Sequence, residues 1–233
     1  MVNKNKTKVL VIQPHSDDAI LSCSKILFDA ENYKSVDILT IENNPIRVLE
    51  DRKLFDFFPA VNYNVLDFDY IDSSHSSYFK SVKKFDELSA DEHIYDLIGD
   101  DGILDLVSKT DDFISDWIRK TEQEGFSFEI YTPLGVGHPF HLLVRKITEG
   151  FATKYYREWP HSFKRRNQDY LMSVFQPRLD GLRFEKDSEH FNIGEHEMKF
   201  KLAQKCYKTQ SGLFFYELGY IKKNLPEEFY SLV

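Results

Sequence analysis

The stretch KVLVIQPHSDDAILSC (residues 8–23) contains a change of pattern that decides the fold. Residues 8–13 form a short apolar run, which predicts a strand buried on both faces of a sheet. From Asp18 onward the apolar residues recur at helical spacing, which predicts a helix. A polar segment that contains His15 and Asp17 joins the two elements.

The alternation of strand and helix patterns continues along the chain. Apolar runs predict further strands over residues 36–41, 63–68 and 128–132. Helical spacing predicts helices over residues 18–30, 46–58, 103–122, 142–151 and 195–208, with Pro139 in the first turn of the fourth. Strands that alternate with helices are typical of α/β proteins with a parallel sheet. The chain contains no repeat or linker, so residues 1–233 are predicted to form one domain.

The composition excludes several classes of protein. A net charge of −8 disfavours nucleic acid as a partner. The apolar run near the N-terminus is too short for a signal peptide, and no segment approaches the ~20 apolar residues of a membrane span. Two cysteines far apart in the chain are typical of a reducing compartment. We therefore expect a cytoplasmic protein without a membrane span, and the sequence is compatible with a homo-oligomer.

A second polar segment follows the strand predicted at 128–132. A short Gly-rich loop leads from this strand to His138 and His141, where the next helix begins. In parallel α/β sheets, ligands bind beyond the carboxyl ends of the strands. The first polar segment also follows the carboxyl end of a strand, so the two segments are predicted to meet.

Each polar segment has an ordinary structural interpretation and a functional one. Asp17 or Asp18 could cap the following helix, because Asp is common at that position. His138 could be a capping or loop residue, and His141 a packed one. Taken together, two histidines and a carboxylate supply the ligands of a catalytic zinc site with one position left for water. The same ligand set also suits Fe²⁺ or another divalent metal.

Five segments of the chain are similar to signatures of one enzyme family. PHSDDAILSC (residues 14–23) resembles the PHxDD signature of the PIG-L/LmbE-like zinc deacetylases. PLGVGHPFHLLVRKI (133–147) resembles their second signature, in which two histidines three residues apart begin a helix. Weaker similarities are found in IRVLEDRKLFDFF (46–58), YYREWPHSF (155–163) and KFKLAQKCYKTQ (199–210). The segments follow the family's order along the chain.

The resemblance implies a three-layer α/β/α Rossmann-like (LmbE-like) fold with a mostly parallel sheet. It also implies hydrolysis of the acetamide of an N-acetylated amino sugar, usually of the N-acetylglucosamine type, or of a related small metabolite or glycoconjugate. Acetate and a free amine are the products. By the same resemblance His15, Asp18 and His141 would hold Zn²⁺, Asp17 would be the general base, and His138 would stabilise the oxyanion or protonate the leaving amine.

The chain departs from the family pattern at Phe140. The family usually has Asp between its two histidines, and without that carboxylate the pKa of His138 should fall. Glu158 could substitute for the missing acid at the substrate site. Phe140 also motivates an alternative hypothesis, in which the protein is a degenerate relative that binds a glycan or metabolite without turnover.

Two arginines of the segment 46–58 are candidates for binding substrate. Arg47 and Arg52 could contact hydroxyls or a phosphate of the substrate, although an exposed arginine is more often simply solvated. A dinucleotide-binding protein is disfavoured, because the turn after the first strand contains no glycine that would let the backbone approach a pyrophosphate.

Overall fold

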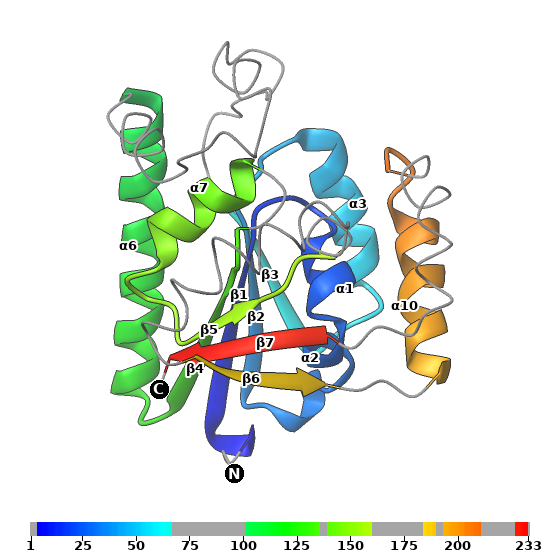
Figure 1. Ribbon diagram of the computed structural model, residues 1–233, viewed down its shortest axis with the longest axis horizontal. Helices are drawn as coiled ribbons and strands as arrows, with labels where there is room; N and C mark the ends of the chain where they lie inside the picture. The colour runs from blue at the N-terminus through cyan, green and yellow to red at the C-terminus, as the bar shows by residue number, and fades with distance from the viewer. Residues whose placement is uncertain are drawn as a thin grey trace.

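The computed structural model describes residues 4–66, 101–135, 139–159, 184–189, 193–210 and 227–232. Within these ranges, seven strands form one sheet in the order β3-β2-β1-β4-β5-β7-β6 (Figure 1). The strands are β1 (Thr7–Gln13), β2 (Ser35–Thr40), β3 (Val61–Val65), β4 (Ser127–Pro133), β5 (Lys154–Tyr156), β6 (Phe184–Glu189) and β7 (Glu227–Leu232). Neighbouring strands in the series β3-β2-β1-β4-β5 are parallel, and β7 is antiparallel to both β5 and β6. The predicted α/β class with a mostly parallel sheet is confirmed.

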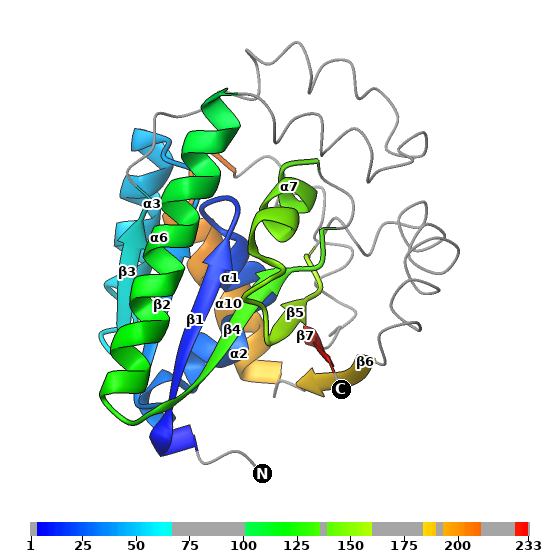
Figure 2. The same ribbon diagram turned by 90° about the vertical axis from the view of Figure 1, so that its left-hand side faces the viewer.

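Helices cover both faces of this sheet. They are α1 (Asp18–Ser22), α2 (Ser24–Phe28), α3 (Pro45–Phe55), α6 (Asp101–Gln123), α7 (Pro139–Thr148) and α10 (Ile193–Cys206), with short 3₁₀ turns at Lys4–Lys6 and Ala30–Asn32. Figure 2 shows α6 and α7 on one side of the sheet and α1, α2 and α10 on the other. The helices and the sheet between them form three layers.

Strand β1 lies between two hydrophobic cores. Val9 and Val11 pack with residues of α1, α2, α3 and α10, whereas Leu10 and Ile12 pack with residues of α6 and α7. All four side chains are fully buried. Successive side chains of a strand point to opposite faces, so a strand covered on both faces must be apolar throughout. This requirement explains the continuous apolar run that predicted the strand.

The prediction of one helix over residues 18–30 is wrong in one respect, because the chain forms two helices, α1 and α2, separated at Cys23. The carboxylate of Glu227 in β7 accepts hydrogen bonds from the backbone N–H of Ser24 at 2.9 Å and of Lys25 at 3.0 Å. It also accepts one from the Ser24 hydroxyl at 2.6 Å and is paired with Lys199 at 2.9 Å. A buried carboxylate thus satisfies the first N–H groups of α2, and α2 begins as a separate helix.

The remaining predicted elements agree with the structure to within a few residues at their ends. Helix α3 begins at Pro45 after the N-cap residue Asn44, whose side chain accepts from the N–H groups of Ile46 and Arg47. It ends at Phe55 rather than at residue 58. Strand β3 begins at Val61, two residues earlier than predicted. Both cysteines are free and buried. In the described part of the chain, no helix has the length and apolar character needed to cross a membrane.

Candidate metal centre

The two polar segments lie at the same edge of the sheet. Strands β1 and β4 are parallel neighbours, with Val11 opposite Tyr131. The loop that carries His15 and Asp18 follows the carboxyl end of β1, and α7, which carries His141, follows the carboxyl end of β4. The sheet topology therefore brings together residues that are 126 positions apart in the sequence.

Three side chains converge there, and each offers one atom of a type that binds metal ions. Nδ1 of His15 lies 2.9 Å from Nε2 of His141. Oδ2 of Asp18 lies 3.6 Å from Nδ1 of His15 and 3.4 Å from Nε2 of His141. Ligands that surround zinc tetrahedrally at ~2.0–2.1 Å are separated from one another by ~3.3 Å. The three separations fit one face of such a tetrahedron, so His15, Asp18 and His141 could hold a metal ion.

The loop between β1 and α1 is held in a tight turn that aims these ligands. The backbone N–H of His15 donates to Oδ2 of Asp18 at 2.8 Å, and the N–H of Asp18 donates to the carbonyl of His15 at 3.3 Å. Asp17 has φ of 112°, a conformation that L side chains rarely adopt. It stands at the N-cap position of α1 but its side chain makes no capping hydrogen bond. The interpretation of Asp17 as an ordinary helix cap is therefore wrong, and backbone strain of this kind is typical of functional sites.

Glu158 lies on the far side of His141 from the other two ligands. Its Oε1 is 3.6 Å from Nδ1 of His141 and accepts a hydrogen bond from the N–H of Gly135. Both Glu158 and His141 are fully buried. A carboxylate next to one ring nitrogen favours a proton on that nitrogen, which leaves the other nitrogen as a metal ligand. Glu158 thus faces a ligand histidine and not open space.

Arg47 lies against the predicted general base. Its Nη2 is 3.0 Å from Oδ1 of Asp17 and its Nη1 is 3.0 Å from a carboxylate oxygen of Glu42. Nη2 also donates to the carbonyl of Ser16 at 2.5 Å. The guanidinium therefore holds the loop and its carboxylate, an assignment that the sequence pattern did not include. Arg52, five residues after Arg47 in α3, has an exposed side chain, and its contact with substrate stays a prediction.

Burial and charge act in opposite directions on the acids and histidines of the metal-free site. Burial raises the pKa of Asp17 well above its usual value, although Arg47 opposes the shift. For Asp18 the positive charge of His141 and the hydrogen bonds of His15 outweigh burial, so its pKa is lowered. Burial lowers the pKa of His15. Burial also acts to lower the pKa of His141, but the Asp18 and Glu158 carboxylates outweigh it and raise that pKa.

Phe140 occupies part of the same site. Its ring lies against His15, with ring centroids 5.1 Å apart, and it packs on the hydrophobic core beneath α7. Phe140 therefore restricts the position of His15 by packing. His138, which was predicted to act in catalysis, lies outside the described residues.

A hydrogen-bond network beside the site was not predicted from the sequence. Its centre is Asp51, which is fully buried in α3 and contacts side chains of three strands and of Tyr207, the residue that follows α10. The signal in the sequence was slight. Asp51 follows Glu50 in a segment rich in charged residues, and nothing in that pattern distinguishes a buried aspartate from a solvated one.

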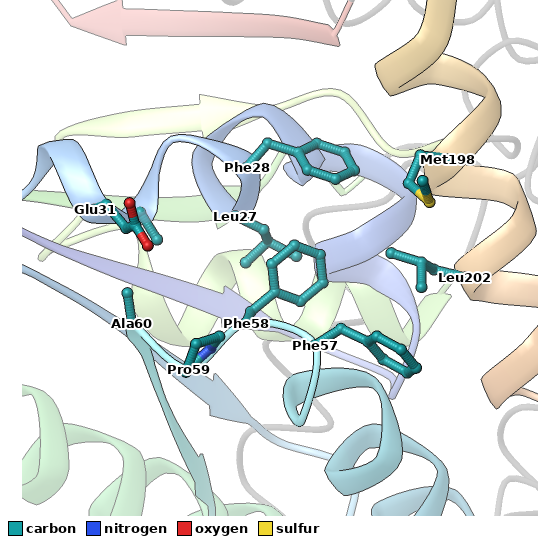
Figure 3. Close-up of a pocket in the computed structure, with 10 residues that line it drawn as sticks. Leu27, Phe28, Glu31, Phe57, Phe58, Pro59, Ala60, Met198 and Leu202 are labelled. Carbon is teal, nitrogen blue, oxygen red and sulfur yellow. The ribbon is translucent and has the colours of Figure 1, made fainter.

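A separate apolar pocket of about 300 Å³ lies away from these residues (Figure 3). Its walls come from α2, the turn before β3 and α10, and they include Leu27, Phe58 and Leu202. The turn before β3 leads into the amino end of a strand, whereas the metal-ligand loops follow carboxyl ends. None of His15, Asp18 and His141 lines this pocket.

Comparisons of the chain with protein-family models, with curated proteins and with solved structures gave no match.

Proposed function

We propose that this protein is a zinc-dependent N-deacetylase of the PIG-L/LmbE-like type, with the fold of that family. The observation that carries the proposal is the convergence of His15, Asp18 and His141 beside Asp17 at the carboxyl edge of the sheet. Two histidines and one carboxylate leave a position for water, and a further carboxylate that is not a ligand is next to them. This arrangement favours hydrolysis over simple metal storage.

The residues of the chain divide the chemistry between them. A bound divalent ion polarises the amide carbonyl and lowers the pKa of water at the site. Asp17 accepts a proton from the attacking water, and burial, which raises its pKa, makes it a stronger base than an exposed aspartate. Arg47 contacts Oδ1 of Asp17, which leaves Oδ2 for the proton. His138 stabilises the oxyanion or protonates the leaving amine in this proposal.

The substrate is proposed to be an N-acetylated amino sugar or a related metabolite or glycoconjugate in the cytoplasm. Zn²⁺ is the proposed ion because the separations of the ligand atoms fit a tetrahedral site. Fe²⁺ is the main alternative for the same ligands. Arg52 remains a candidate contact for the hydroxyls of the sugar.

Metal analysis combined with detection of released amine tests the proposal. The purified full chain should bind about one equivalent of Zn²⁺ and release acetate from at least one of a panel of N-acetylated sugars, sugar nucleotides and glycosides. Changing His15, Asp18 or His141 to Ala should abolish metal binding. A protein that takes up no divalent metal would contradict the proposed function.

Phe140 favours a second candidate function, binding of a glycan or metabolite without turnover. Phe140 stands at the sequence position where the family usually has Asp, and its ring packs against His15. In this case the wild type binds metal and ligand but releases no amine, and Phe140→Asp gains activity. Release of amine by the wild type itself would reject this second candidate.

A further inference from the structure

The carboxylate of Asp51 accepts hydrogen bonds from four side chains. The donors are Nε2 of Gln13 at 2.8 Å, Oγ1 of Thr40 at 3.2 Å, and the hydroxyls of Tyr63 at 2.9 Å and Tyr207 at 2.5 Å. Gln13, Thr40 and Tyr63 belong to β1, β2 and β3, Tyr207 directly follows α10, and Asp51 belongs to α3. Asp51 has no exposed surface. Burial of a carboxylate is unfavourable unless donors satisfy it, and this one is surrounded by donors.

Asp51 also decides which way the side-chain amide of Gln13 points. An ionised carboxylate only accepts hydrogen bonds, so the NH₂ group of Gln13 must face Asp51. The oxygen of Gln13 is then on the opposite side, where it accepts from the backbone N–H of Ala19 at 2.9 Å. A neutral group in place of Asp51 would weaken this selection, because an amide or hydroxyl can both donate and accept. The orientation of Gln13 would then depend on the Ala19 N–H and on Thr40, whose Oγ1 accepts from the same Nε2 at 2.6 Å.

The hydrogen bond from Ala19 to Gln13 closes the metal-ligand loop. Gln13 is the last residue of β1, and Ala19 is in the first turn of α1. The five residues between them include His15 and Asp18. The hydrogen bond from Ala19 to Gln13 therefore helps to set the separation of His15 and Asp18, and Asp51 orients the Gln13 side chain that accepts it.

We propose that Asp51 is a positioning residue of the metal centre, which acts through Gln13 to hold His15 and Asp18 at the spacing that His141 requires. Asp51 does not contact a ligand, substrate or metal ion itself. The inference rests on the metal centre of the proposed function and does not depend on the identity of the substrate.

Glu50 provides a matched comparison within the same helix. It is buried next to Asp51 in the sequence, and its carboxylate accepts from the N–H of Thr209 at 2.9 Å and from the Thr209 hydroxyl at 2.5 Å. Both carboxylates therefore tie α3 to the end of α10, which packs beside it (Figure 1). In the described part of the chain, the hydrogen bonds of Glu50 go to Thr209, whereas Asp51 also accepts one from Gln13 of β1.

The experiment compares the wild type, Asp51→Asn and Glu50→Gln as full chains. We would measure the affinity for Zn²⁺ by competition with a chelator and the absorption spectrum of the Co²⁺ form, which reports the geometry of the ligands. Asp51→Asn should weaken Zn²⁺ binding about tenfold or more and change the Co²⁺ spectrum, as is typical of changes behind the metal ligands. Glu50→Gln should lower the unfolding midpoint but keep the affinity and the spectrum of the wild type.

Two results would overturn the inference. One is an Asp51→Asn protein with the affinity and spectrum of the wild type, and the other is a Glu50→Gln protein that loses as much affinity as Asp51→Asn. If Asp51→Asn does not fold, Gln13→Leu replaces it, because this change removes the hydrogen bond to Ala19 and leaves Asp51 three donors. An unchanged spectrum in Gln13→Leu would equally overturn the inference.

The outcome is separable from that of the deacetylase proposal. A wild type that binds Zn²⁺ but releases no amine contradicts the proposed activity, while the spectra still decide the role of Asp51. A wild type that binds no Zn²⁺ overturns both.

Discussion

The guanidinium of Arg47 lies between two buried carboxylates, 3.0 Å from Oδ1 of Asp17 and 3.0 Å from an oxygen of Glu42. One cation thus neutralises two acids in a place with little solvent, because the Arg47 side chain is only 13% exposed. Burial would lower the pKa of Arg47, but Asp17 and Glu42 outweigh burial and raise it. Arg47 stays charged and holds the proposed general base in position.

Removal of this cation should destabilise the protein strongly. Arg47→Met leaves Asp17 and Glu42 buried without a counter-charge, and we expect the free energy of unfolding to fall by about 3–5 kcal/mol. Arg52→Met is the control, because the exposed Arg52 side chain should change stability by no more than ~0.5 kcal/mol. Urea denaturation of the metal-free proteins measures both values. Equal stability of the two variants would argue against a structural role of Arg47.

Substitution of the proposed base should separate catalysis from metal binding. Asp17→Asn should retain Zn²⁺ and lose ~10²–10⁴-fold in the rate of acetate release, because asparagine cannot accept the proton. The free energy of unfolding should fall less than in Arg47→Met, because asparagine tolerates the positive φ and Glu42 still neutralises Arg47. Metal analysis, amine detection and thermal unfolding test the three expectations. Full activity in this variant would exclude Asp17 as the base.

The carboxylate next to His141 should contribute to metal affinity. Glu158→Gln keeps the size of the side chain but removes the charge that faces Nδ1 of His141, and we expect about tenfold weaker Zn²⁺ binding. Glu149→Gln is the matched control. Glu149 pairs with Lys146 near the end of α7 at 3.5 Å, and its loss should leave the affinity unchanged. A chelator competition assay measures the affinities. Wild-type affinity in Glu158→Gln would show that this carboxylate does not contribute to Zn²⁺ binding.

The charge of Asp51 should make stability depend on pH. Burial raises its pKa from 3.8 to about 6, while hydrogen bonds from Tyr207 and Tyr63 limit the shift. The folded protein then binds more protons than the unfolded chain between about pH 4 and pH 6, so the contribution of Asp51 to stability falls as the pH rises through this range. A shift of about two pKa units corresponds to about 3 kcal/mol.

Urea denaturation of the wild type and Asp51→Asn at pH 4.5 and pH 7.5 isolates this contribution, because the other titrating groups are common to both. The stability of the wild type relative to Asp51→Asn should decrease from the lower pH to the higher one. A difference that is independent of pH would show that Asp51 titrates at its ordinary value.

Much of the fold was predictable because apolar residues mark the buried faces of strands and helices locally. Val9 to Ile12 lie between two helical layers, and their continuous apolar character predicted this position. The two histidine segments were predictable as neighbours for a related reason. Each follows a strand, and parallel strands place their carboxyl ends at one edge of the sheet.

The contacts between distant side chains were not predictable in the same way. The break at Cys23 depends on Glu227, 203 residues beyond Ser24, and Asp51 gains Tyr207 from 156 residues away. A buried carboxylate and a solvated one look alike in a sequence, because burial is a property of what packs around the residue. The sequence made Arg47 a candidate contact for substrate, which stays a prediction, but it did not reveal that Arg47 pairs with Asp17.

The sequence by itself determined the order of strands β1 to β4 and of the main helices, but not strands β5 to β7. It also determined that His15, Asp18 and His141 are ligand-type residues that follow strand ends. The tertiary structure decided which carboxylates face them. It placed Asp17 in a strained turn against Arg47, Glu158 behind His141, and Asp51 beneath Gln13. Local patterns encode the solvent-facing and core-facing sides of an element, whereas hydrogen bonds and charge pairs in the interior form only when several elements pack together and exclude water.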